Sequence, residues 1–167
     1  SVKLSFLSPS GHFIGSLEGA IKGNVLLRRA QYRMSEDELL STHLGSLFIG
    51  GKIANHRSIL RRFLRDHHPD ETITEEIENS ICLLKRELGM LPHQHTRLEI
   101  MGVEGYSANI YFGVFKHLIL NPEFQFEKRS KRPPKDEVNA LLSFFYTLLA
   151  HDVRAALETV GLDAYVG

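Results

Sequence analysis

Residues 132–149 read RPPKDEVNALLSFFYTLL, and this stretch indicates the fold more clearly than the rest of the chain. Its two prolines are followed by Asp136, a residue type that caps helix N-termini, and Glu137 places a negative charge in the first turn of the predicted helix. The apolar residues that follow, as far as Val160, spread around most of the helical cylinder, and Gly161 is a natural stop. A helix with this pattern is typical of the interior of a large helical core.

Helical patterns also precede this stretch. Asn24 is placed to cap a short first helix. Ser35 and Glu38 have the spacing of a capping box, which predicts the start of a long helix that runs to about Arg65. We expect the glycine pair at 50–51 to bend or split that long helix.

Two further helices are predicted between the long helix and the last one. The first begins at Thr72 or Thr74 and ends near Gly89, because apolar residues recur there at helical spacing. The second covers about 96–120 and stops before the proline that follows Asn121. With the helices above, these patterns predict a mainly α protein.

The beginning of the chain has a different pattern. Apolar and polar residues alternate over 2–6, residues 9–11 are a turn signal, and residues 13–17 can return as a second strand. Two strands alone are marginally stable in water. This hairpin therefore indicates the end of a sheet whose other strands lie outside the chain, and we expect the chain to be an internal part of a longer protein.

The composition excludes several classes of protein. The chain has 167 residues, of which 43% are hydrophobic and 24% charged, as in soluble globular proteins and unlike disordered ones. Basic and acidic residues number 20 each, so a uniformly basic nucleic-acid binder is excluded, although a local basic face is not. The single cysteine, Cys82, excludes a disulfide scaffold and favours a cytoplasmic location. No apolar run reaches about 18 residues, which predicts that no membrane is involved.

Basic residues nevertheless gather locally. Residues 128–135 read KRSKRPPK, and arginines recur every four residues along the long predicted helix. Such rows neutralise DNA phosphates and release counterions. They are also compatible with solvated helix faces that are paired with nearby acidic residues. The candidate DNA-binding residues are Arg57, Arg61, Arg62, Arg65, Lys128, Arg129, Lys131 and Arg132.

Glu104 is the most informative single acidic residue. It lies between Gly102 and Gly105 in a predicted helix that is otherwise largely apolar. A carboxylate in this position must be exposed, paired or bound to a cation, because burying it alone is costly. From spacing alone, an exposed glutamate is the simpler interpretation.

The adjacent residues His151 and Asp152 suggest a different enzyme. Such a pair on a helix resembles the dyad of the HD-type metal phosphohydrolases. That family needs a further histidine upstream and an aspartate downstream, and Asp163 is the sole downstream aspartate in the chain. A third possibility is a non-catalytic helical domain that binds DNA through its basic rows.

Several stretches together resemble a known family. They are similar to the CRISPR-associated integrase, the metal-dependent DNA endonuclease and integrase subunit of the spacer-acquisition complex, in its type I form. The similarity covers essentially the whole chain and is most specific in the last two stretches. The stretches are residues 2–8, 24–33, 51–55, 102–105, 132–149 and 161–167.

This resemblance implies a domain organisation. The family has a small N-terminal β domain and a larger helical C-terminal domain. Residues 1–22 would then be the remnant of the β domain, and residues 23–167 part of the C-terminal helical catalytic domain. The fold class expected for this chain is mainly α, with a terminal β-hairpin followed by an incomplete all-helical domain.

The resemblance also implies an activity. The family joins the 3′ ends of a short DNA to the CRISPR repeat by transesterification, with Mg²⁺ or Mn²⁺ held by a glutamate, a histidine and an acidic residue. Glu104 occupies the position of the glutamate, as catalytic residue and metal ligand. The other two ligands would follow Gly167, so we expect this chain alone to be inactive and to hold metal poorly.

The family's partners follow from the same resemblance. We expect the whole protein to bind DNA, both a short duplex and the CRISPR repeat. It would form a homodimer, assemble with a second small adaptation subunit, and act in the cytoplasm.

Overall fold

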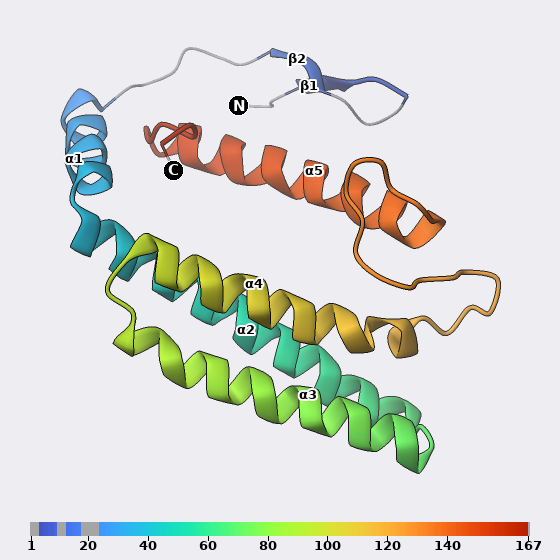
Figure 1. Cartoon of the computed structure of the whole chain (residues 1–167). Helices are drawn as coiled ribbons and strands as arrows, with labels where there is room; N and C mark the ends of the chain where they lie inside the picture. The colour runs from blue at the N-terminus through green and yellow to red at the C-terminus, as the bar shows by residue number, and fades with distance from the viewer. Residues whose placement is uncertain (1–3, 10–12, 18–23, 167) are drawn as a thin grey trace. The chain divides into compact units, whose positions relative to one another are not determined.

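The computed structural model describes residues 4–9, 13–17 and 24–166, and it is mainly helical (Figure 1). This confirms the predicted fold class. The described elements, with η marking short 3₁₀ helices, are β1 (Leu4–Leu7), β2 (Phe13–Leu17), α1 (Val25–Glu36), α2 (Glu38–His67), α3 (Glu71–Met90), η1 (Leu91–His93), α4 (Arg97–Val114), η2 (Phe115–Leu118) and α5 (Glu137–Thr159).

The chain divides into two compact units. One unit is Asp37–Arg129, and the other takes in the described residues of Ser1–Glu36 and Ser130–Gly167. The first unit is therefore continuous in sequence, whereas the second joins both ends of the chain. This division does not address the domain boundary predicted between residues 22 and 23, which stays a prediction.

The predicted hairpin is confirmed for its described residues. β1 and β2 pair antiparallel, with Leu4 opposite Leu17 and an irregularity after Phe6. Residues 2 and 3 of the predicted first strand and residues 10 and 11 of the predicted turn at 9–11 lie outside the described residues. The apolar side chains described in the hairpin are exposed, as expected for two strands without a covering layer: Leu4, Phe6, Ile14 and Leu17.

Three helices build the core of the continuous unit. α2, α3 and α4 each contact the other two and lie side by side (Figure 1). The buried residues recur at helical spacing, for example Ile53 and Leu60 on α2 and Ile77 and Leu84 on α3, all four of which are almost completely buried. The rest of this core comprises Phe63, Leu91, Ile100, Val103, Tyr111 and Val114.

The predicted start of the long helix is wrong by two residues. α1 continues to Glu36, and the Ser35 hydroxyl donates to the backbone oxygen of Tyr32 at 2.8 Å. The side chain that caps α2 is Asp37, which accepts a hydrogen bond from the backbone N–H of Leu40 at 3.0 Å. An ionised carboxylate satisfies this amide and also interacts favourably with the positive end of the helix dipole.

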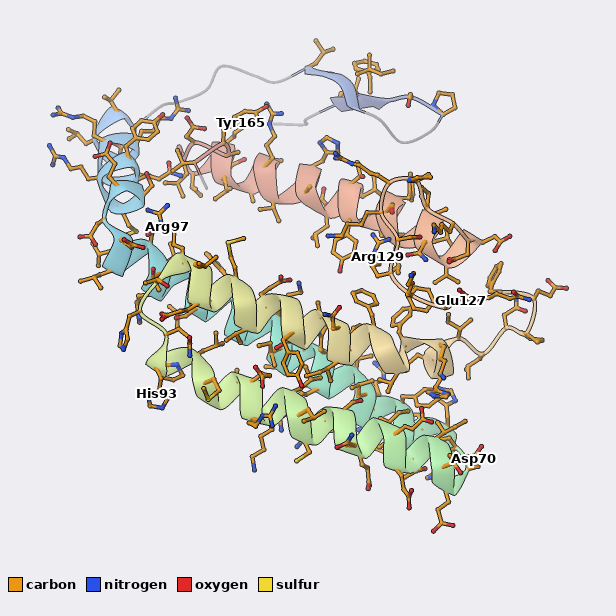
Figure 2. All side chains as sticks on the ribbon, in the orientation of Figure 1. Asp70, His93, Arg97, Glu127, Arg129 and Tyr165 are labelled. Carbon is orange, nitrogen blue, oxygen red and sulfur yellow. The ribbon has the colours of Figure 1, made fainter. Side chains whose placement is uncertain are left out.

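At α3, too, an aspartate caps the helix where the sequence predicted a residue with a hydroxyl side chain. Asp70, which Figure 2 labels at the start of that helix, accepts from the backbone N–H of Ile73 at 2.9 Å. The expected caps, Thr72 and Thr74, lie inside the helix. The helix continues to Met90 and passes into η1, which contains the labelled His93 (Figure 2).

Two other predicted caps, Asn24 and Asp136, are confirmed, and Thr96 caps α4 at the predicted start of that helix. Asn24 accepts from the backbone of α1 at 3.1 Å, and Asp136 caps α5 through a contact of 2.7 Å. Thr96 begins α4 with a complete capping box, in which the Thr96 hydroxyl accepts from the Glu99 N–H and the Glu99 carboxylate accepts from the Thr96 N–H. Signals of this kind are local, so the sequence alone reveals them.

The glycine pair does not split the long helix. α2 runs from Glu38 to His67 as one helix. The glycine that the packing requires is Gly45, where an added Cβ would lie 2.7 Å from Cδ1 of Ile100 on α4. A Cβ at Gly50 would make only ordinary contacts with α3 and η1. Close approach of α4 to α2 therefore explains Gly45.

In the second unit, side chains of α1 hold the segment that follows α5. The side-chain amide of Gln31 makes two hydrogen bonds of 2.8 Å with the backbone of Asp163, one as donor and one as acceptor. The hydroxyl of Tyr32 donates to the Asp163 carboxylate at 2.7 Å, and Arg28 donates to the backbone oxygen of Gly161. We call these contacts the α1 clasp.

α5 ends as predicted. Gly161 adopts a positive φ of 87°, and the N–H of Leu162 returns to the oxygen of Leu157 at 2.9 Å, which is the Schellman arrangement.

The prediction that α5 is buried in a core is not met within the described residues. Its buried residues are Val138 and Asn139, while Leu141, Phe145 and Leu149 are about half exposed or more. By length and composition α5 is the one described helix that meets the criterion for a membrane span, although core helices of soluble proteins meet it too. The prediction that no membrane is involved stays a prediction.

The three-helix core generates a stability prediction. Replacing the completely buried Leu60 with alanine leaves a cavity among α2, α3 and α4, and should lower the free energy of unfolding by about 2–5 kcal/mol. Urea denaturation followed by circular dichroism measures this change. Leu47→Ala, on the same helix but exposed, is the matched control and should change stability by less than about 0.5 kcal/mol. Equal effects of the two variants would contradict the assigned core.

Candidate functional site

Glu104 lies at the edge of the contact between α4 and α2. The residue before it, Val103, is buried in the core, so the next position turns toward the margin of the interface. There the carboxylate forms an ion pair with the ammonium of Lys52 on α2. The two side chains are 37% and 38% exposed, respectively. Of the three states expected for this carboxylate, the structure shows it half-exposed and paired.

One turn after Lys52, α2 carries a buried histidine. The ring of His56 stacks flat on that of Tyr111, with 3.9 Å between ring centroids and 6° between planes. Burial lowers the pKa of His56 to about 4, and the charge of Lys52 acts in the same direction, while Glu104 opposes it. His56 is therefore neutral at neutral pH. Its Nδ1 has no hydrogen-bond partner among the described residues.

Ser107 lies on the same side of α4 as Glu104 and Tyr111. It is 2% exposed, and its hydroxyl oxygen also has no hydrogen-bond partner among the described residues. Buried polar atoms are normally hydrogen-bonded. The α2–α4 interface therefore combines one half-exposed ion pair with two buried polar groups.

The described residues do not complete a metal site. Among them, no group of three histidine, cysteine, aspartate or glutamate side chains is placed to hold a metal ion. Mg²⁺ takes about six ligands, mostly oxygen atoms. The Glu104 carboxylate has the right chemistry and accessibility for one of these ligands, but its described partner is an ammonium group.

The alternative based on His151 and Asp152 receives no support from the structure. These residues lie on α5 outside any described metal-binding group. The aspartate that this alternative needs, Asp163, belongs to the α1 clasp. The backbone N–H of Tyr165 and the hydroxyl of Tyr32 hold the pKa of Asp163 below its ordinary value.

The predicted arginine row on α2 does not share the side of the helix that carries Lys52. At about 100° per residue, Arg57, Arg61 and Arg65 lie about 140–220° around the helix from Lys52. Arg61 is exposed and Arg57 is partly buried. The structure therefore separates this row from the Glu104 edge.

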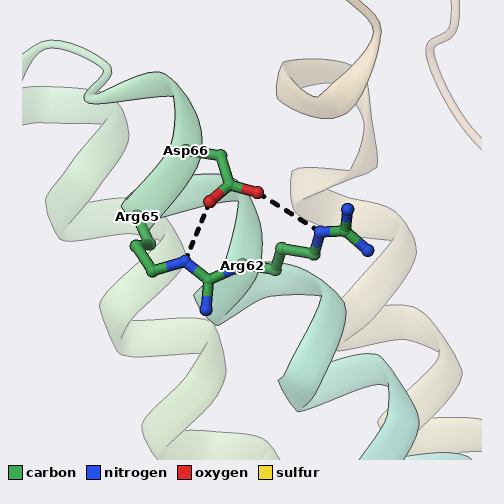
Figure 3. Close-up of polar contacts among 3 residues, drawn as sticks. All are labelled: Arg62, Arg65 and Asp66. Atoms are coloured by element: carbon green, nitrogen blue, oxygen red, sulfur yellow. Dashed lines mark hydrogen bonds and ion pairs between the residues drawn. The ribbon is translucent and has the colours of Figure 1, made fainter.

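Arg65, a member of the row, shares one acidic partner with Arg62, which lies beside the row. Nε of Arg62 and Nε of Arg65 contact the two carboxylate oxygens of Asp66 at 3.2 and 2.8 Å (Figure 3). The hydrogen bond from Arg65 lowers the pKa of Asp66. Half of the positive charge of this pair of arginines is thus neutralised within the helix.

The second basic stretch is a loop anchored by a buried residue. The side-chain oxygen of Asn139, which is completely buried, accepts from the backbone N–H of Ser130 at 2.8 Å. The Ser130 hydroxyl accepts from the N–H of Lys135 at 3.0 Å. Between these anchors, Lys131 and Arg132 are exposed.

The other two basic residues of this stretch come just before Ser130. Lys128 is exposed, and Arg129, which Figure 2 labels, is partly buried. Both belong to the unit Asp37–Arg129, whereas Lys131 and Arg132 belong to the other unit.

Lys52 and His56 were not predicted as site residues from the sequence. Their spacing of four residues on a helix places them on one face, and a lysine followed by a histidine among apolar residues was the available signal. Which carboxylate faces them depends on packing between elements, so the spacing alone does not lead to Glu104.

Comparisons with known proteins agree with the resemblance. The family described as CRISPR associated protein Cas1 matches residues 1–167. The CRISPR-associated endonuclease Cas1 1 of Chlorobaculum tepidum is 46% identical over 168 residues, which cover 99% of this chain and 49% of that protein. The chain thus spans about half the length of the curated relatives that it matches.

Solved structures share the fold. A casposase bound to an integration product matches with a TM-score of 0.79 and 25% identity, over 99% of this chain and 44% of that one. A chain of a Cas6-RT-Cas1–Cas2 complex matches with a TM-score of 0.78 and 24% identity, over 99% of this chain and 18% of that one.

The buried histidine generates a pH prediction. The unfolded chain protonates His56 near pH 6.5, whereas the folded chain does so near pH 4. Stability from this residue is therefore complete above pH 6.5 and is lost between pH 6.5 and 4, by up to about 3 kcal/mol. His56→Phe keeps a ring against Tyr111 and removes the titration. Its free energy of unfolding, measured by urea denaturation, should fall less over this pH range than that of the wild type, and identical pH dependence would refute the assignment.

Proposed function

Because the chain belongs to the Cas1 family of CRISPR-associated proteins, we propose that the protein containing it is a DNA integrase of CRISPR spacer acquisition. The observation that carries this proposal is the family match over the whole chain, combined with an accessible Glu104 carboxylate at the α2–α4 edge. Relatives that bear the name endonuclease, and the casposase of similar fold that is bound to an integration product, support the same class of chemistry.

The proposed reaction is a transesterification. The 3′-hydroxyl of a short DNA attacks a phosphodiester of the CRISPR repeat, a new phosphodiester forms, and the old 3′-oxygen leaves with the proton. A bound Mg²⁺ or Mn²⁺ would polarise the phosphodiester. Glu104 would supply one carboxylate ligand, and a histidine and an acidic residue outside the described residues would complete the protein ligands. On this proposal, the chain alone holds divalent metal weakly and does not join DNA.

The basic residues provide the proposed contacts with the DNA backbone. Phosphate contacts fix the position of a duplex without reading its sequence. Lys131 and Arg132 are favoured because they are exposed on an anchored loop, and Arg61 is favoured on α2. Arg62 and Arg65 are weaker candidates because they share Asp66.

The proposed partners follow from the family and the fold. One solved chain of similar fold belongs to a complex that is named for both Cas1 and Cas2, which supports a second small adaptation subunit. We also propose a homodimer of the whole protein and a cytoplasmic location without membrane association.

A non-catalytic DNA-binding domain is the second candidate function, because the described residues contain no complete metal group. It predicts salt-dependent DNA binding without strand joining by the whole protein.

The role of Glu104 is tested by Glu104→Gln in the whole protein assembled with its small partner. Joining of a labelled short duplex to repeat DNA, with Mg²⁺ or Mn²⁺ present, should fall at least about 100-fold, because a lost metal ligand removes several kcal/mol of transition-state stabilisation. Glu75→Gln, an exposed residue of α3, is the control and should leave the rate unchanged. Wild-type joining by Glu104→Gln would reject the role proposed for this carboxylate.

The basic loop is tested by replacing both Lys131 and Arg132 with glutamine. Duplex affinity should fall, and the slope of log affinity against log salt concentration should decrease in magnitude by about 2, since each lost phosphate contact contributes about 0.9. Fluorescence anisotropy at several salt concentrations measures both quantities. Arg62→Gln, whose guanidinium already pairs with Asp66, should have a smaller effect. An unchanged slope in the double variant would remove the loop from the interface.

A further inference from the structure

The carboxylate proposed to bind a divalent cation already has a cation beside it. Lys52 forms the ion pair with Glu104, and no other described basic group is within ion-pair distance of that carboxylate. We infer that Lys52 is an exchangeable counter-ion: a divalent cation at Glu104 releases its ammonium, which then binds a phosphate of the DNA backbone. This inference rests on the proposed role of Glu104 as a metal ligand.

The surroundings of the pair favour movement of the lysine side chain alone. Ile53, the residue after Lys52, is 1% exposed in the core, and Val103, the residue before Glu104, is also buried. One turn further along α2, the flat stack of His56 on Tyr111 joins the same two helices. These contacts fix the backbone on both sides of the interface.

The ammonium, in contrast, is free to leave. The side chain of Lys52 is 38% exposed, and a lysine carries its charge on a flexible four-carbon stem. An ion pair with this exposure is weak, because water screens the charges and two side chains lose rotational freedom. A divalent cation therefore replaces the ammonium at small cost.

Charge balance gives the released ammonium its next partner. Glu104 and Lys52 together are neutral. With a divalent cation and the second acidic ligand of the proposed site added, the group carries an excess of one positive charge. Phosphodiester groups supply the compensating negative charge, and a lysine ammonium binds phosphate as a point charge. Lys52 should thus contribute to DNA binding when the metal is present. It should contribute little when the metal is absent and its ammonium is paired with Glu104.

Two substitutions of Lys52 should change metal affinity in opposite directions. Lys52→Met removes the competing cation and should raise the affinity of the whole protein for Mn²⁺ about two- to fivefold without DNA, as expected for a half-exposed pair. Lys52→Arg should lower that affinity, because a guanidinium can pair with a carboxylate through two hydrogen bonds. The probe is Mn²⁺ itself, whose free concentration is read by electron paramagnetic resonance.

Affinity for a short duplex supplies the second measurement. With Mn²⁺ present, Lys52→Met should weaken binding and reduce the magnitude of the salt slope by about 1. Without metal, the same variant should bind the duplex as the wild type does. Lys85→Met, at an exposed lysine of α3, is the matched control and should leave Mn²⁺ affinity unchanged. Circular dichroism confirms that each variant is folded.

The outcomes separate this inference from the proposed function. If Glu104→Gln leaves Mn²⁺ binding intact, Glu104 is not a ligand, and both proposals fail together. If Glu104→Gln abolishes Mn²⁺ binding but Lys52→Met leaves it unchanged or weaker, the function stands and the exchange is wrong. The exchange of Lys52 for a divalent cation would also be wrong if Lys52→Met lost the same amount of duplex affinity with Mn²⁺ as without it.

Discussion

The packing of α2 against both α3 and α4 is the constraint on which the rest of the continuous unit depends. Ile53 and Leu60 exclude water between the three helices and fix how α2 lies along α4. That arrangement sets Lys52 opposite Glu104 and His56 against Tyr111, so the polar groups of the site take their positions from apolar neighbours. A protein interior packed this closely transmits small shifts, which makes the geometry of the ion pair sensitive to the core beneath it.

Sequence patterns predict much of this fold because helix signals are local. The predicted caps at Asn24 and Asp136 follow from residues within one turn of each helix start. The starts of α2 and α3 were wrongly placed because serine, threonine and aspartate stand within a few residues of each other, and all can cap. At each of these two starts, the aspartate is the residue whose side chain faces the free amides.

The candidate site was only half predictable. Glu104 was apparent from its own surroundings, since a carboxylate among glycines and apolar residues needs an explanation. Its partner Lys52 lies 52 residues away, and only the packing of two helices brings them together. α5 shows a second limit of sequence-based prediction. Its apolar residues indicate that the helix favours an apolar environment, but they do not indicate which part of a protein packs against it.

The α1 clasp has a consequence for the order in which the protein is made. Gln31 and Asp163, which it joins, are 132 residues apart, and a ribosome adding about 5–20 residues per second needs on the order of ten seconds to span them. All of Asp37–Arg129 emerges within that interval and has its three-helix core available for folding. α1 therefore spends its first seconds without the segment that it later holds.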